Sequence, residues 1–183
     1  MVPRLFFYVP ERIPHGFRSI IGSEIEGDST VSGQIEARLE QMGLQIPAAP
    51  APAGSYVPVI QVGNLVITSG QIPFVGKELM FTGKLGDELH EEDGYNAARI
   101  CALNALAQIK ACAGDLDLVK RIIRIEGNVH SAPGFQQQAH VLNGASDLIN
   151  KLFGEKGKHT RTAIGINEMP LNAAVQISMW AEV

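Results

Sequence analysis

The last nine residues alternate between apolar and mainly polar side chains, and this pattern constrains the fold more than any other feature of the chain. The odd-numbered positions are all apolar, namely Val175, Ile177, Met179, Ala181 and Val183. The even-numbered positions hold Gln176, Ser178, Trp180 and Glu182. Successive side chains of a β-strand point to opposite faces, so one face of this strand is buried and the other meets more polar surroundings. We therefore expect a sheet with one face covered by other elements.

Two longer segments have the periodicity of helices that can cover such a face. Residues 92–113 carry an apolar stripe formed by Ala98, Cys101, Ala102, Ala105, Ile109 and Cys112. A second helix is expected to begin near Gly134 or Phe135 and to end at Gly154. Its stripe is formed by Val141, Leu142, Ala145, Leu148, Ile149, Leu152 and Phe153. A shorter helix is expected over residues 35–42.

Apolar and β-branched runs indicate the remaining strands. Residues 57–62 and 65–69 are joined by Gly63-Asn64, which favours a tight hairpin, and residues 119–129 lie between the two helices. The order ββαβαββ predicts an α/β (α+β) fold, with two helices packed on one face of a mixed sheet. If the last two strands, which flank the turn at residues 169–172, pair as a hairpin, Arg161 and Gln176 share a face. The other sheet face is mixed in character, and we expect subunits of a homo-oligomer to meet there.

Composition limits the partners of the chain. Its net charge of −4 and pI of about 5.7 offer no basic field for nucleic acid, and no apolar run approaches the roughly 20 residues of a membrane helix. Cys101 and Cys112 cannot reach each other along one helix, so reduced thiols and a cytoplasmic location are expected. No two of the five histidines are spaced i, i+4, so no metal site is predicted.

The first 33 residues differ from the rest of the chain. They contain Pro3, Pro10 and Pro14 and show neither helical nor strand periodicity. We predict an N-terminal extension at 1–33, partly disordered, followed by one domain at 34–183.

Arg161 is the strongest candidate for a functional side chain. Ala163 and Gly165 share its strand face and leave room beside it, so its guanidinium could bind a carboxylate through two parallel hydrogen bonds. A surface salt bridge is the alternative, and the residues alone favour that alternative. His159, two residues earlier, could tune a site, but an exposed loop position is the expectation for it.

Three motifs together make residues 35–183 resemble the Rid family, the reactive intermediate deaminases of the YjgF type. They are Gly54-Ser55-Tyr56, the run from Val62-Gly63-Asn64 to Thr68-Ser69-Gly70-Gln71-Ile72-Pro73, and Arg161-Thr162-Ala163 running to Met169-Pro170. The resemblance implies a chorismate-mutase-like sandwich assembled as a homotrimer with intersubunit clefts. It also implies hydrolysis of imino or enamino acids to 2-oxo acids and ammonia, without a cofactor.

The resemblance also assigns roles to individual residues. Arg161 matches the arginine that binds the substrate carboxylate, and Tyr56 matches an aromatic residue contributed across the interface. Ser69 and Gly70 match a loop that lines the pocket, and Asn143 matches an asparagine near its mouth.

Two positions depart from the family pattern. Ala163 replaces a cysteine, and Gln176 replaces the carboxylate that positions water. A glutamine can hydrogen-bond a water but cannot accept its proton. A non-catalytic protein that binds small carboxylates is therefore the second hypothesis. The endoribonuclease activity suggested for some relatives is the third, and the acidic pI argues against it.

Overall fold

Strand β7 (Val175–Glu182) lies in the middle of a five-stranded sheet of order β1-β2-β7-β5-β6. The protein is represented by a computed structural model that describes residues 33–52 and 54–183, so the predicted extension falls outside the described residues except for Gly33. The apolar positions of β7 are completely buried, as the alternation predicts, and Gln176, Ser178 and Trp180 face the opposite side. The predicted one-sided sheet is therefore confirmed.

The other strands follow the predicted order ββαβαββ. Strands β1 (Val59–Val62) and β2 (Leu65–Thr68) form an antiparallel hairpin, and β2 pairs with β7. Strand β5 (Arg121–His130) is antiparallel to β7 and parallel to β6 (Thr160–Ile166), so the sheet is mixed. Two short strands, β3 (Phe74–Val75) and β4 (Glu78–Leu79), form a separate hairpin.

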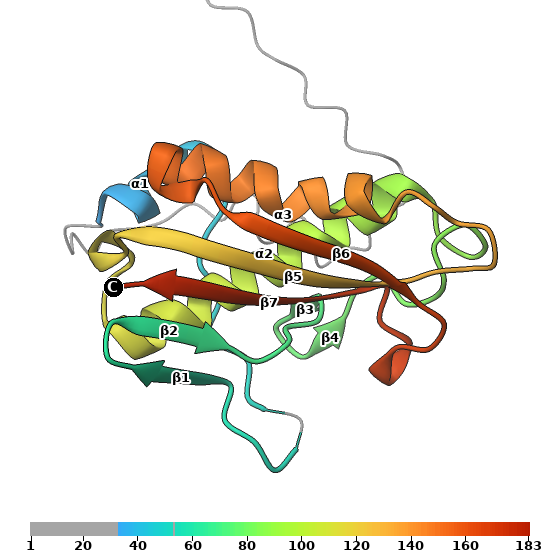
Figure 1. Cartoon of the computed structure of the whole chain (residues 1–183), viewed down its shortest axis with the longest axis horizontal. Helices are drawn as coiled ribbons and strands as arrows, with labels where there is room; N and C mark the ends of the chain where they lie inside the picture. The colour runs from blue at the N-terminus through green and yellow to red at the C-terminus, as the bar shows by residue number, and fades with distance from the viewer. Residues whose placement is uncertain (1–32, 53) are drawn as a thin grey trace, which may run out of the picture.

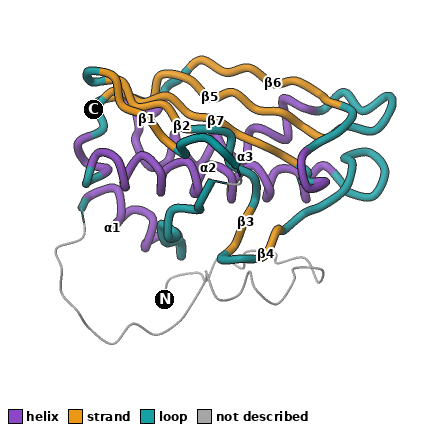
Figure 2. Tube along the Cα trace, turned by 90° about the horizontal axis from the view of Figure 1, so that it is seen from below, coloured by secondary structure: helices purple, strands orange, loops and turns teal. Residues whose placement is uncertain are grey.

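The helices form a second layer on one face of the sheet, as Figure 2 shows. Helices α2 (Glu91–Ala113) and α3 (Gln138–Phe153) pack against each other and against the sheet. Helix α1 (Gln34–Gln41) begins where the Asp117 carboxylate accepts hydrogen bonds from the backbone N–H groups of Gln34 (2.7 Å) and Ile35 (2.9 Å). None of the described helices is both long enough and apolar enough to cross a membrane.

The two main helices approach closely at Gly144. A Cβ atom on this residue would lie 1.9 Å from the Tyr95 carbonyl oxygen of α2, far inside van der Waals contact. The missing side chain lets α3 pack directly on the α2 backbone. This contact also fixes the helix turn that carries Asn143.

The last two strands do not form the hairpin considered from the sequence. Figure 1 shows β5 between β6 and β7. Helix α3 connects β5 to β6 as a βαβ unit, and such a crossover places parallel strands side by side. In register, Arg161 lies beside Ile125 on the helix-covered face, whereas Gln176 lies beside Asn128 on the open face. The expectation that Arg161 and Gln176 share a face is therefore wrong.

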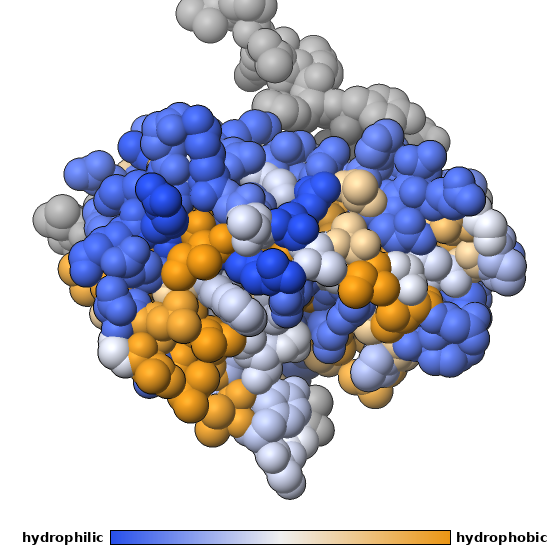
Figure 3. All heavy atoms as spheres, in the orientation of Figure 1, coloured by the Kyte–Doolittle hydropathy of each residue, from blue (hydrophilic) through white to orange (hydrophobic). Residues whose placement is uncertain are grey.

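The open face carries exposed apolar side chains. Figure 3 views this face and shows apolar residues gathered over β1 and β2, where Ile60 is 51% and Val62 is 63% exposed. Near the centre of the sheet, the Arg124 guanidinium lies over the Trp180 ring at 5.8 Å and donates to Glu126 Oε1 at 2.7 Å.

Candidate functional site

Arg161 is held against α3 by three hydrogen bonds to residues between positions 139 and 146. Its Nη1 donates to Asn143 Oδ1 and to Ser146 Oγ, each at 2.9 Å, and its Nη2 donates to the Ala139 carbonyl oxygen at 3.0 Å. The residue is half-buried at an edge strand of the sheet. Asn143 and Arg161, both assigned to the site from the sequence, are thus in direct contact.

The acceptors that hold Arg161 are all uncharged. Among the described residues, no carboxylate forms an ion pair with this guanidinium. The three hydrogen bonds use both Nη1 hydrogens and one Nη2 hydrogen, so Nε–H and the second Nη2–H have no recorded acceptor in the described part of the chain. The side chain is fixed in place by neutral acceptors, and two of its N–H donors remain without an acceptor in the described part of the chain.

His159 extends this network from the other side. Its Nδ1–H donates to the Gly157 carbonyl at 2.6 Å, and its Nε2 accepts from the Ser146 hydroxyl at 3.0 Å, which in turn accepts from Arg161. Burial lowers the pKa of His159 below its ordinary 6.5. The hydrogen bond to the Gly157 carbonyl raises this pKa, and the nearby positive charge of Arg161 lowers it, so the net shift is downward. The expectation of an exposed loop histidine is wrong, because the side chain is a neutral acceptor in this network.

The lowered pKa of His159 predicts a pH-dependent stability. Below pH 6.5 the unfolded chain binds this proton more readily than the folded chain, so the free energy of unfolding should fall as the pH drops. We expect the wild-type protein to lose more stability than the His159→Gln variant between about pH 7.5 and pH 5. Urea unfolding of both proteins at the two pH values measures the difference. Equal losses would show that His159 carries no linked proton.

A second group of predicted residues lies on the other side of the sheet. Gln176 Oε1 accepts from Asn128 Nδ2 at 3.1 Å, and the Gln176 amide packs on Gly70 so closely that a Cβ there would lie 2.4 Å from Gln176 Cδ. Gly70, Gln176 and Tyr56 line one pocket of about 430 Å³. Gly70 therefore provides the space that the Gln176 side chain occupies.

The structure divides the predicted residues between two places. Ala163 lies beside Arg161 on the helix-covered face of β6 and is half-buried. Ser69 lies next to Gly70, but its hydroxyl donates to the Val57 carbonyl at 2.6 Å and it is not among the residues that line the pocket. One group thus contains Arg161, Asn143 and Ala163, and the other contains Tyr56, Gly70 and Gln176.

The two groups are too far apart to bind one small acid within a single chain. Arg161 and Gln176 are separated by two strand spacings of about 4.8 Å and by three residues of about 3.3 Å along the strands, and they face opposite sides. The distance that results from these two offsets is well beyond the length of a three- or four-carbon acid. Within one chain the two groups are therefore separate.

Several residues that support these two groups were not identified from the sequence, among them Asn104 and Gln108, which donate to backbone carbonyls of the pocket lining. Ser146 lies in the apolar stripe of α3, where a serine gives little signal, and Asn128 lies within a strand. Asn104 and Gln108 offered a clearer signal, because two amides spaced i, i+4 interrupt an otherwise apolar helix face. Among residues 33–52 and 54–183, no cluster of three or more histidine, cysteine, aspartate or glutamate side chains could hold a metal ion.

Comparisons with known proteins agree with this architecture. A family model described as "YjgF/chorismate_mutase-like, putative endoribonuclease" matches residues 36–183. Protein TCP17 of Trypanosoma cruzi is 42% identical over 153 residues, which cover 83% of this chain and 96% of that protein. A 2-iminobutanoate/2-iminopropanoate deaminase of Dermatophagoides farinae is 28% identical over 135 residues, which cover 73% of this chain and 90% of the deaminase.

A solved structure gives the same result in three dimensions. The crystal structure of a protein named "putative endoribonuclease" from Shewanella oneidensis superimposes with a TM-score of 0.79 and 38% identity, covering 81% of this chain and 99% of that one. The family model spans nearly all of the described residues, including both groups of candidate residues. The chain is therefore a member of the YjgF/chorismate mutase-like family and has the chorismate-mutase-like fold that its sequence suggested.

Proposed function

We propose that this protein hydrolyses reactive imino and enamino acids of amino-acid metabolism to 2-oxo acids and ammonia. The observation that carries the proposal is the hydrogen bonding of Arg161. Its guanidinium donates only to uncharged acceptors, and its remaining N–H donors suit a carboxylate. The named activity of the Dermatophagoides relative supports the same chemistry.

The reaction requires little acid–base catalysis. Water adds to the C=N carbon of R–C(=NH₂⁺)–COO⁻, the C–N bond breaks, and the products are R–CO–COO⁻ and NH₄⁺, so atoms and charge balance. Arg161 would hold the carboxylate, and a fixed carboxylate orients the C=N carbon toward a water molecule. Gln176 would hold that water by a hydrogen bond without removing its proton.

A complete site would need a second copy of the chain. The Arg161 half and the Gln176 half lie on opposite faces, so an acid bound to Arg161 of one copy would meet the pocket of its neighbour. A homotrimer with three such clefts is the assembly that the family resemblance implies. The exposed apolar residues of β1, Ile60 and Val62, offer surface for such a contact.

Two free cysteines fit the proposed cytoplasmic location.

Binding without turnover is the second candidate function, and Gln176 favours it. We expect Gln176→Glu to raise kcat for imine hydrolysis by about 10²-fold, because a carboxylate at this position can accept the proton of the attacking water. Asn128 Nδ2 would still have an acceptor there. Gln41→Glu, which adds the same charge at the exposed end of α1, should leave kcat unchanged.

Steady-state rates of the two glutamate variants and the wild type provide the measurement. An unchanged or lower kcat in Gln176→Glu would contradict the role assigned to residue 176.

The proposal is tested with freshly generated 2-iminopropanoate or 2-iminobutanoate. We expect the protein to accelerate release of the 2-oxo acid above the spontaneous rate. Binding of the 2-oxo acid without acceleration would instead establish a carboxylate-binding protein. RNA cleavage with a steep salt dependence would indicate the endoribonuclease activity that some relatives are named for.

A further inference from the structure

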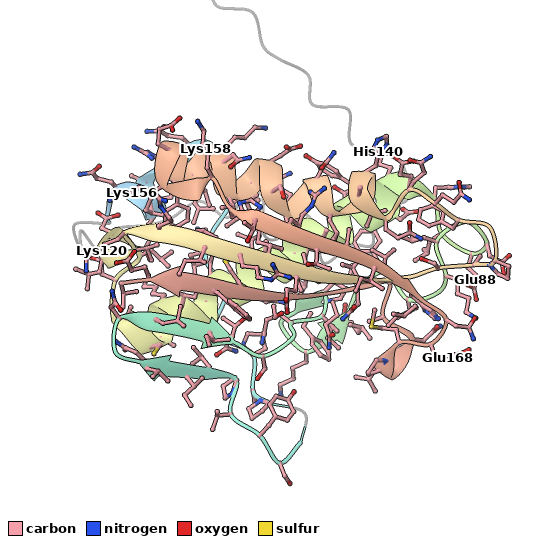
Figure 4. The ribbon with its side chains drawn as sticks, in the orientation of Figure 1. Glu88, Lys120, His140, Lys156, Lys158 and Glu168 are labelled. Carbon is pink, nitrogen blue, oxygen red and sulfur yellow. The ribbon has the colours of Figure 1, made fainter. Side chains whose placement is uncertain are left out.

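The pocket beside Gln176 is much larger and more apolar than a methyl or ethyl side chain requires. Its volume is about 430 Å³, and none of its twelve described lining residues is charged. Its walls include Pro50, Pro52, Ile72, Phe74, Pro170 and Leu171. Glu168, which Figure 4 shows beside the turn that carries Leu171, lies outside the lining, and its Oε1 is 3.5 Å from Lys84 Nζ.

Two buried amides of α2 hold two of the segments that line this pocket. Asn104 Nδ2 donates to the carbonyl oxygens of Ile72 and Phe74, each at 3.0 Å, and Gln108 Nε2 donates to the Pro50 carbonyl at 2.6 Å. Both amides are almost completely buried, at 1% and 2% exposure. A buried polar side chain is costly unless it is hydrogen-bonded, so these amides are specific ties between the helix and two irregular segments. The pocket is therefore preformed.

Leu171, at the pocket wall, has a backbone conformation that leucine rarely adopts. It lies in the 3₁₀ turn η4 (Pro170–Asn172) with φ of 58°, a left-handed conformation that is unfavourable for a bulky residue. The residue is 62% exposed, so burial in the core does not compensate for this strain. Strained residues concentrate at ligand-binding positions. An exposed, strained leucine at a pocket wall is suited to contact an apolar ligand.

We propose that the protein selects imino acids and 2-oxo acids with bulky apolar side chains, of the size of leucine or phenylalanine. This inference rests on the proposed function, because Arg161 of a neighbouring copy would bind the carboxylate. A methyl side chain would leave most of the pocket without contacts, whereas a branched or aromatic one would fill it. The uncharged walls would also reject acidic and basic side chains.

Binding of 2-oxo acids to the full chain tests this selection, measured by isothermal titration calorimetry. We expect 4-methyl-2-oxopentanoate and phenylpyruvate to bind at least about 10-fold more tightly than pyruvate, since several methylene-sized contacts are added. Leu171→Asn should reduce this ratio severalfold, because asparagine accepts the left-handed backbone but removes apolar surface. Leu118→Asn, at a similarly exposed leucine outside the pocket, should leave the ratio unchanged.

The outcomes distinguish the proposed side-chain selection from the proposed function on which it rests. If pyruvate binds in an Arg161-dependent manner and the bulky acids bind no better, the side-chain selection is overturned and the proposed function stands. If none of the acids binds, both are overturned. A ratio that is unchanged in Leu171→Asn would also overturn the pocket as the origin of the selection.

Discussion

Replacement of Arg161 by glutamine is expected to lower kcat/KM for imine hydrolysis by about 10³-fold. The variant loses two charge-assisted hydrogen bonds to the substrate carboxylate, each contributing about 1.5–3 kcal/mol, and 1.36 kcal/mol corresponds to a factor of ten. Arg161→Lys should show a smaller loss, because the ammonium retains the charge but not the paired donors. Steady-state kinetics and 2-oxo acid binding measure both effects.

Arg121→Gln is the matched control for the loss of one positive charge. Arg121 is exposed at the start of β5 and contacts neither half of the site, so its replacement should leave kcat/KM unchanged. Thermal unfolding of each variant distinguishes a lost ligand contact from a lost fold. A folded Arg161→Gln protein with wild-type kcat/KM would remove the basis of the proposed function.

Mixing variants tests whether the two halves come from different copies. Arg161→Gln disables one half, and Gly70→Val would disable the other, because any Cβ at residue 70 displaces the Gln176 amide. Co-expression of the two variants should give more activity than the sum of the separate proteins, since some clefts then contain two intact halves. No gain on mixing would contradict a shared cleft.

Replacement of Gly144 by alanine is expected to destabilise the fold by about 3 kcal/mol, at the upper end of the range for overpacking. The added Cβ would lie 1.9 Å from the Tyr95 carbonyl oxygen, and a helix backbone cannot yield as a flexible side chain can. The gain in helix propensity from glycine to alanine is about 1 kcal/mol and does not offset the clash. Urea unfolding measures the change, which for a domain of this size corresponds to a fall in Tm of about 6–12 °C.

Asn150→Ala on the exposed face of α3 is the control for this substitution. It gains helix propensity without a clash, so its stability should equal or exceed that of the wild type. Gly144→Ala should also weaken 2-oxo acid binding, because the same helix turn carries Asn143, which holds Arg161. Wild-type stability in Gly144→Ala would mean that the two helices can separate at little cost.

Much of the fold was predictable because side-chain periodicity reports on local burial. The alternation in β7 and the stripes of α2 and α3 depend only on backbone geometry, in which a strand repeats every two residues and a helix every 3.6. The alternation in β6 also grouped Arg161 and Ala163 on one face, but it did not show that this face is the one that the helices cover. These patterns could not identify Ser146 or Asn128, because a hydrogen-bond partner distant in sequence leaves no periodic signal.

The sequence by itself determined the main elements, their order and the face that β7 buries, since these follow from interactions along a few consecutive residues. Only the tertiary structure decided which strands are neighbours. The βαβ connection through α3 places β5 between β6 and β7, and this pairing turns Arg161 toward the helices and Gln176 toward the open face. Strand pairing is a long-range choice that depends on the summed packing of the whole sheet. For this reason the separation of Arg161 from Gln176 became visible only in the folded chain.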